Sequence, residues 1–391
     1  MNETKVTDAV RYIGVHDKTL DLFESQYAVP FGMTYNSYVI LDDKIAVMDT
    51  VDERATKAWI SNLRNVLDGK TPDYLVISHM EPDHAANVKY LAELYPNMKI
   101  VANAKEFAMI EQFFGEDYKE RGIVVKENDT LSLGTHTLQF IMAPMVHWPE
   151  VMVTYEKSEQ ILFSADAFGR FGGADPKEEW TDEARRYYIN IVGKYGKQVQ
   201  MLLKKLSGLP VSKICSLHGA VLDSDIDFYL GKYDTWSSYR PEEEGVFIAY
   251  ASIYGHTKEV AIRLAQMLKK QGSKVVLCDL TREDISGAAA NAFRYDKMVL
   301  ACSTYDGSLF PPMEAFLHRL KVKNYQNRKV ALIENGTWAP MAKKLMRTYM
   351  ESMKDVTICD TMVSIKSALK QENLECMETL AKELSDNRKK E

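Results

Sequence analysis

The stretch SHMEPDH at positions 78–84 places two histidines and two carboxylates within six residues. Such a cluster is costly to bury unless a positive charge sits among the side chains, because like charges repel and lose their hydration. The apolar run 73–78 leads into it and predicts a short buried strand, and α/β proteins build their sites beyond the carboxyl ends of strands. His79 and Glu81 are two residues apart, so an extended segment points both the same way. The stretch therefore predicts a metal site that can serve two adjacent ions.

Three more potential ligands stand where other predicted strands end: His147, Asp166 and His218. Each has an ordinary alternative, because a lone histidine after a strand is more often a hydrogen-bonded polar residue and an aspartate is a common turn former. Four histidines and three carboxylates at strand ends are, however, hard to attribute to chance. We predict that the metal ligands are His79, Glu81, Asp83, His84, His147, Asp166 and His218.

Length and composition restrict the class of protein. A chain of 391 residues with 46% hydrophobic residues predicts about two globular domains. The net charge of −6, without a long lysine–arginine block before the tail, disfavours nucleic acid as a partner. No signal-peptide core or membrane-spanning run occurs, and the 5 cysteines are scattered without a C-x-x-C pair. We therefore expect a cytoplasmic protein without a rubredoxin-like module of its own.

The pattern of strands and helices changes near residue 240. Before it, short strands and occasional helices predict an α/β layered sandwich, with a hairpin at 35–51 and a long helical stretch at 181–206. The polar run GKYDTWSSYRPEEEG (231–245) predicts a linker. After it, regular alternation of strands and helices predicts an open, doubly wound parallel sheet. We place the first domain at 1–243 and the second at 244–391.

Three loops of the second half resemble the FMN-binding loops of flavodoxins. The first combines hydroxyl residues and a glycine with a helix start, whose N–H groups can cradle a phosphate. The other two carry Tyr305 and Trp338, whose flat faces can stack on a flavin ring, although a turn residue and a helix-packing residue are the plain alternatives. The predicted FMN contacts are Ser252, Ile253, Tyr254, Gly255, His256, Thr257, Ser303, Thr304, Tyr305, Asp306, Gly307, Asn335, Gly336, Thr337 and Trp338. We assign no role to His16, His136 or His318.

The pattern H-x-E-x-D-H at 79–84, with H-W-P-E at 147–150, S-A-D-A-F-G at 164–169 and C-S-L-H-G at 215–219, resembles the flavodiiron proteins. Hydrolases of the same metallo-β-lactamase fold carry histidine where this chain has Glu81. The resemblance spans about residues 5–385 and implies an N-terminal αββα sandwich followed by a flavodoxin-like domain. It also implies that His79, Glu81 and His147 hold one iron, that Asp83, His84 and His218 hold the other, and that Asp166 bridges them.

The donor set supports iron independently of the resemblance. Replacing an imidazole by a carboxylate hardens the site and adds negative charge, which suits Fe(II) and Fe(III), while zinc stays an alternative because it binds such sites tightly. The cofactors implied are FMN and two iron ions. Two ferrous ions and a reduced flavin store four electrons, which is what reduction of O₂ to water requires, and NO needs two electrons per N₂O formed. We therefore expect an oxidoreductase that acts on O₂, NO or both.

The resemblance also implies partners. A separate rubredoxin donates electrons in bacterial members and a reduced deazaflavin in some archaeal ones. We expect a head-to-tail homodimer or a dimer of dimers, because the two sites lie on separate domains and need a second subunit to approach each other. The glycine-rich segment GRFGGADPKEEW (169–180) is expected to shape the entrance of the iron pocket.

Two other functions stay open at this point. The first is a metallo-β-lactamase-fold hydrolase whose flavodoxin-like half serves as an accessory domain. Glu81 disfavours this function, because the hydrolases carry histidine at that position. The second is a flavin electron carrier or quinone reductase whose metal half is only structural. It predicts unchanged activity after His79→Ala or Asp166→Ala.

Overall fold

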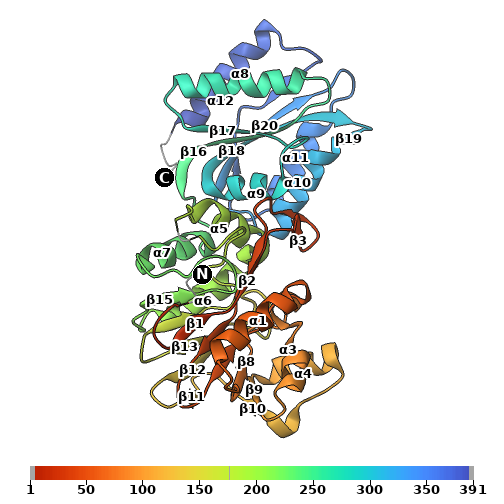
Figure 1. The fold of residues 1–391 in the computed structure, drawn as a ribbon. Helices are drawn as coiled ribbons and strands as arrows, with labels where there is room; N and C mark the ends of the chain where they lie inside the picture. Colours follow the sequence, from red (N-terminus) through yellow and green to blue (C-terminus); the bar gives the residue numbers. More distant parts are fainter. Residues whose placement is uncertain (1–4, 176, 387–391) are drawn as a thin grey trace. The chain divides into compact units, whose positions relative to one another are not determined.

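The computed structural model describes residues 5–175 and 177–386. The chain divides into two compact units, Met1–Asp234 and Thr235–Glu391 (Figure 1). Residue 176 of the predicted entrance segment lies outside the described residues, and so do residues 1–4 and 387–391.

Two sheets form the first unit. The six-stranded sheet has the order β1-β6-β7-β8-β9-β10 and the five-stranded sheet the order β11-β12-β13-β14-β15. The strands of the first are β1 (Val10–Tyr12), β6 (Tyr38–Ile40), β7 (Ala46–Met48), β8 (Tyr74–Val76), β9 (Lys99–Ala102) and β10 (Gly122–Val124). Those of the second are β11 (Thr130–Ser132), β12 (Thr137–Met142), β13 (Met152–Glu156), β14 (Ile161–Phe163) and β15 (Lys213–Cys215). Pairs β2 (Val15–Asp17) with β5 (Met33–Tyr35) and β3 (Leu22–Phe23) with β4 (Tyr27–Ala28) form two small ribbons.

The core of this unit lies between the two sheets. Met48 and Val76 of the first sheet belong to the same buried cluster as Phe140, Met152 and Phe163 of the second. Burying one such side chain contributes about 1.5–3 kcal/mol, so the two inner faces hold the sheets together. Strands β7 to β10 run parallel, as do β14 and β15, so several carboxyl ends meet at shared edges.

Helices flank the sheets and complete the predicted αββα sandwich (Figure 1). Helix α1 is amphipathic, since Trp59, Ile60, Leu63 and Leu67 are its buried residues. The stretch predicted as one helix at 181–206 is interrupted by a π-helical turn (Tyr188–Val192) and a 3₁₀ turn (Gly193–Tyr195). The helices are α1 (Thr56–Leu67), α2 (Pro82–Ala85), α3 (Val88–Leu94), α4 (Ala104–Phe114), α5 (Thr181–Tyr187), α6 (Gly196–Leu206) and α7 (Ile226–Ser237).

The predicted linker at 231–245 is wrong over most of its length. Helix α7 continues to Ser237, and its residues Tyr233 and Trp236 are buried. The next strand already begins at Glu243, which leaves only 238–242 between the two elements. The polar residues of this run led to the linker prediction, although two of its aromatic side chains are buried.

The second unit contains the predicted parallel sheet, with the order β17-β16-β18-β20-β21. Its fifth position is split, because β21 and β22 both pair parallel with β20 at successive registers. The strands are β16 (Glu243–Ala251), β17 (Val275–Asp279), β18 (Tyr295–Tyr305), β19 (Ser308–Leu309), β20 (Arg328–Asn335), β21 (Val356–Ile358) and β22 (Val363–Ile365). The helices are α8 (His256–Lys270), α9 (Ile285–Arg294), α10 (Pro311–Val322), α11 (Ala342–Glu351) and α12 (Gln371–Ser385).

A substitution of Leu264 in α8 tests how much this core contributes to the stability of the second unit. The residue is fully buried in a cluster with Ile248 and Leu380, so Leu264→Ala is expected to lower the free energy of unfolding by about 2–5 kcal/mol. Hydrogen–deuterium exchange of α8 and β16 peptides measures the loss. The exposed neighbour Arg263 provides the control, since Arg263→Ala is expected to change stability by less than about 0.5 kcal/mol. Equal exchange in both variants would contradict this account of the core.

Candidate metal centre and flavin site

The end of β8 fixes the position of the first ligands. Asp49, directly after the neighbouring strand β7, accepts a hydrogen bond from the Ser78 backbone N–H at 2.6 Å. Glu81 has an extended backbone conformation, and the short helix α2 begins directly after it at Pro82. Proline suits the first position of a helix, because an N–H group at that position would have no partner within the helix and proline lacks this group. The extended part presents His79 and Glu81, and the helix presents Asp83 and His84.

One group of ligands surrounds Glu81. Its Oε2 lies 3.3 Å from His79 Nε2 and 3.0 Å from His147 Nε2. Oδ2 of Asp166 lies 2.9 Å from the same nitrogen of His147 and 3.6 Å from that of His79. The ligand atoms of these four residues all lie within 4.8 Å of one another.

A second group lies on the other side of Asp166. Oδ2 of Asp83 is 3.2 Å from His84 Nε2 and 3.3 Å from His218 Nε2. Oδ1 of Asp166 is 3.2 Å from His84 Nε2 and 3.7 Å from His218 Nε2. The two oxygens of one buried carboxylate therefore face two different groups, and the structure brings all seven predicted ligand residues together.

The donor atoms fit cations at both positions. Neither oxygen of Asp83 nor Oδ1 of Asp166 makes a hydrogen bond within the described part of the chain, although all three are buried. His218 directs Nδ1 at the Thr34 carbonyl oxygen, 2.6 Å away, so this nitrogen donates and Nε2 carries a lone pair. That lone pair faces His84 Nε2 at 3.1 Å. Buried acceptors without donors are costly, and a metal ion between them removes the cost.

The electrostatics agree with this arrangement. Burial opposes ionisation of Asp166, but the hydrogen bond from His147 and the charges of the nearby His84 and His79 hold the pKa of its carboxyl well below the usual range. Burial would lower the pKa of His147, yet the carboxylates of Asp166 and Glu81 raise it to about 9. The carboxylates are therefore ionised at neutral pH, and a bound metal displaces a proton from His147.

Sequence reasoning missed the residues that orient these ligands. Oε1 of Glu150 accepts hydrogen bonds from His79 Nδ1 at 2.8 Å and from the Met80 backbone N–H at 3.0 Å. Asn103 holds the backbone of Glu150 through its Nδ2, at 2.6 Å from the carbonyl oxygen. Glu150 closes the H-W-P-E motif, so its place in the motif was a usable signal. Asp49 and Thr34 carried no such signal.

In the second unit, the three predicted flavin loops follow β16, β18 and β20, which are neighbours in the sheet. The prediction that 303–307 is a loop is wrong in its first part, because β18 extends to Tyr305 and turns back into β19. Apolar residues end at Cys302, but backbone pairing of Thr304 with Leu309 continues the strand. Ser303 and Thr304 thus belong to a strand, and Asp306 and Gly307 form the turn.

Hydroxyl and amide side chains tie these segments together. Thr257 Oγ1 lies 2.8 Å from Ser303 Oγ, and Ser252 Oγ accepts from the Gly255 N–H at 3.2 Å. Asn335 Oδ1 accepts from the Ser367 N–H at 3.1 Å, which joins a fourth segment, after β22, to the group. Ser367 was not predicted, because the split of the fifth strand is not visible in the sequence pattern.

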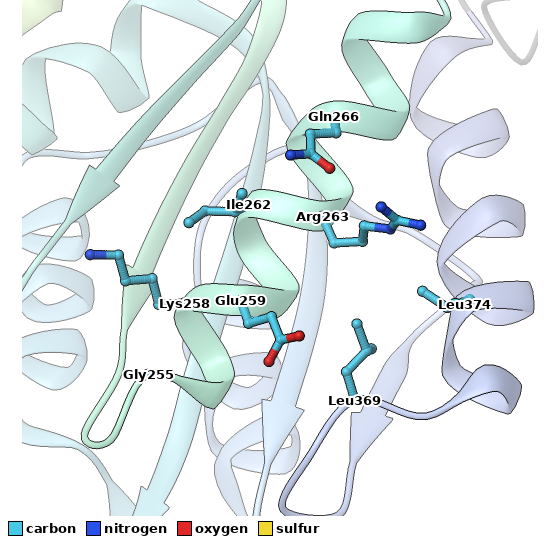
Figure 2. Close-up of a pocket in the computed structure, with 8 residues that line it drawn as sticks. All are labelled: Gly255, Lys258, Glu259, Ile262, Arg263, Gln266, Leu369 and Leu374. Atoms are coloured by element: carbon cyan, nitrogen blue, oxygen red, sulfur yellow. The ribbon is translucent and has the colours of Figure 1, made fainter.

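The aromatic residues of these segments are open to solvent in the single chain. Tyr254 is 91% exposed, Trp338 81% and Tyr305 44%. A groove of about 590 Å³ starts at Gly255 and follows α8 toward Leu369 and Leu374. Figure 2 shows Lys258, Glu259 and Arg263 along its α8 side. Of the predicted FMN contacts, Gly255 is the one that lines this groove, so the groove continues away from the phosphate loop.

Comparison with known proteins finds a matching family model for each of the two units. The family model of the ODP family beta lactamase matches residues 33–219, and the flavodoxin domain model matches residues 247–389. The anaerobic nitric oxide reductase flavorubredoxin of Escherichia coli is 27% identical over 361 residues, which cover 88% of this chain and 74% of that protein. The solved structure of rubredoxin oxygen:oxidoreductase from Desulfovibrio gigas is similar with a TM-score of 0.91 and 26% identity, covering 98% of this chain and 97% of that one. The chain belongs to the flavodiiron family.

One relative matches this chain over nearly its whole length. An uncharacterised protein of Methanocaldococcus jannaschii is 27% identical to this flavodiiron protein over 390 residues, covering 98% of each chain. FMN and a diiron centre are the cofactors of the flavodiiron family, and its members are oxidoreductases. Among the described residues, no helix of this flavodiiron protein combines the length and the apolar character that crossing a membrane requires.

Glu150 is expected to strengthen metal binding through His79. Glu150→Gln keeps the shape of the side chain but removes the negative charge next to the imidazole of His79. The iron affinity of this flavodiiron protein is therefore expected to fall about 10–100-fold. Competition with a chelator under anaerobic conditions measures the affinity. Glu93→Gln, at an exposed position, serves as the control. If both variants bind iron equally well, Glu150 does not support the centre.

Gly255 is expected to be needed for its backbone conformation. Its φ is +96°, and a Cβ added there meets no atom within 4 Å, so Gly255→Ala introduces backbone strain without a clash. Strain of about 1–2 kcal/mol corresponds to FMN binding weaker by roughly 5–30-fold, measured by flavin fluorescence on titration of the flavin-free protein. Gly287→Ala is the matched control, because that glycine also has open space but lies in helix α9. Equal affinities in the two variants would disprove the role of the left-handed conformation.

Proposed function

We propose that the chain reduces O₂ to water, NO to N₂O, or both, at an iron pair supplied with electrons by FMN. The observation that carries this proposal is the placement of Asp166, whose two oxygens face two separate groups of histidine and carboxylate ligands. A bridging carboxylate holds two metal ions close enough to act on one small molecule or on two NO molecules together.

The ligand roles follow the two groups. His79, Glu81 and His147 hold one iron. Asp83, His84 and His218 hold the other, and Asp166 bridges the pair. When bound, the two irons supply single-electron chemistry and open coordination positions for a diatomic gas. Glu81 adds a negative charge that stabilises the oxidised metal, while Glu150 and the Thr34 carbonyl keep the imidazoles of His79 and His218 in fixed orientations.

The FMN site comprises the three predicted segments 252–257, 303–307 and 335–338. The N–H groups at the start of α8, preceded by Gly255, bind the phosphate, and Tyr305 and Trp338 flank the ring. We place the diiron domain at 1–243 and the FMN domain at 244–391. The Escherichia coli relative is an anaerobic nitric oxide reductase flavorubredoxin and the Desulfovibrio gigas protein a rubredoxin oxygen:oxidoreductase, which supports a small electron-transfer protein such as rubredoxin as the donor.

The working unit that we propose is a head-to-tail homodimer or a dimer of such dimers. Tyr254 and Trp338 are the most exposed large aromatic residues of the described chain. Exposed aromatic side chains are typical of protein interfaces. A partner subunit that covers them also excludes water from the flavin.

Asp166→Asn tests the proposed reaction. The amide offers one oxygen and one NH₂ group, so it cannot bind two cations, and consumption of both gases is expected to fall by at least about 100-fold. The measurement is anaerobic NO consumption and, separately, O₂ consumption with reduced rubredoxin, after iron and FMN analysis. The FMN content is expected to stay at the level of the native protein. Unchanged gas consumption would instead favour a flavin electron carrier with a structural metal half.

A second variant separates this proposal from a zinc hydrolase. Glu81→His restores the histidine that the hydrolases carry at this position, so it is expected to shift metal content from iron toward zinc and to lower O₂ consumption. Elemental analysis after expression in medium with equal iron and zinc gives the readout. The exposed His318→Ala variant is the control. Equal iron content in Glu81→His and native protein would overturn this account of Glu81.

A further inference from the structure

A third cluster of possible metal ligands lies in the turns of the second sheet. His136 stands in the turn between β11 and β12, Glu156 ends β13, and Glu159 lies in the turn between β13 and β14. These turns are at the end of the strands opposite to His147 and Asp166. Strand β12 has 6 residues, so the two ends are roughly 20 Å apart. The cluster is therefore separate from the diiron centre.

The histidine of this cluster is held in one orientation. His136 Nδ1 donates to Asp42 Oδ2 at 2.8 Å, and the His136 backbone N–H donates to the same oxygen at 2.6 Å. The ring therefore cannot turn without loss of the first hydrogen bond, and Nε2 is directed at the two glutamates. A carboxylate behind an imidazole is the usual arrangement for a metal-binding histidine, since it fixes the tautomer and raises basicity.

The spacing of the ligand atoms suits one metal ion. His136, Glu156 and Glu159 each offer an atom, and these atoms lie within 4.8 Å of one another. Nε2 of His136 is 3.9 Å from Oε2 of Glu159, too far for a hydrogen bond. Two ligand atoms that each lie about 2.0–2.2 Å from a zinc ion are at most about 4.4 Å apart. The gap therefore accommodates a metal ion between the two side chains.

The charge balance also favours a cation. Glu156 is fully buried, and in the described part of the chain no lysine or arginine nitrogen lies within 4 Å of its carboxylate or that of Glu159. The backbone N–H groups of Ser158 and Glu159 each donate to Glu156, which leaves lone pairs on both oxygens. Together with Asp42, three carboxylates surround one imidazole. A protonated histidine compensates one of these charges, whereas a divalent ion compensates two.

We propose that His136, Glu156 and Glu159 bind a divalent transition-metal ion, with Asp42 positioning the histidine. One imidazole and two carboxylates suit Zn²⁺, with water in the fourth position because Glu159 is partly exposed. The ion ties the β11–β12 turn to the β13–β14 turn. It also fixes the segment near Thr7, whose hydroxyl donates to Glu159 Oε2 at 2.6 Å. The role of the site is to stabilise this end of the sheet, with no part in the redox reaction.

The test uses the iron- and FMN-loaded protein. Equilibrium dialysis against buffered Zn²⁺, followed by elemental analysis, is expected to show one zinc ion per subunit bound in addition to an unchanged iron content. Anomalous diffraction at the zinc edge locates the ion. Absence of zinc at stoichiometric amounts, or zinc gained only as iron is lost, would overturn the proposal.

Three variants grade the expected effect. Asp42→Asn removes a residue that orients a ligand, so it is expected to weaken zinc binding by roughly 10–100-fold. His136→Ala removes a ligand itself, so it is expected to weaken zinc binding by more than that. Glu159→Gln is a partly exposed, isosteric change that leaves folding intact and still removes a ligand. His318→Ala is the matched control and is expected to bind zinc normally. Native affinity in His136→Ala and Glu159→Gln would show that these side chains are not ligands, whatever the zinc content.

Discussion

The placement of Asp166 is the constraint on which the diiron unit depends. A carboxylate buried between four imidazoles and two further carboxylates is stable only when cations occupy the space on both of its sides. The fold meets this requirement by bringing together three strand ends and one connecting loop. The end of β8 belongs to one sheet and the ends of β14 and β15 to the other. The apolar core between the sheets therefore sets the distance between the two ligand groups.

The sequence pointed to the seven residues that meet at this centre, but to few of the groups that support them. His79 to His84 form a local pattern, and strand ends made His147, Asp166 and His218 recognisable. Glu150 stands in the H-W-P-E motif, but it contacts His79 across 71 positions, and the motif does not show which residue it contacts. Thr34 contributes a backbone carbonyl, which any residue type could provide. A ligand has a required side chain, whereas an orienting group needs only the right atom at the right place.

The second unit shows the same division between local and distant information. Alternating apolar runs were sufficient to predict a parallel sheet and the helices between its strands. The extension of β18 to Tyr305 depends on pairing with β19, and the split of the last strand into β21 and β22 depends on pairing with β20. Cross-strand hydrogen bonds decide both features, and these are set by tertiary structure. The three predicted flavin segments nevertheless lie at the same carboxyl edge, although 303–305 belong to β18, because strand order alone determines which segments are neighbours.

The two ends of the five-stranded sheet solve the same problem of buried charge in different ways. At the end that holds Asp166, ligands from both sheets converge, so loss of any one side chain leaves a charge uncompensated. At the other end, His136 lies in the β11–β12 turn and Glu156 at the end of β13, both in a single sheet, and Asp42 approaches from the β6–β7 hairpin of the other sheet. The first arrangement requires the complete sandwich, whereas the second can order the turns that help to form it. Metal binding at the turns therefore stabilises the frame that positions the diiron ligands, without any contact between the two sites.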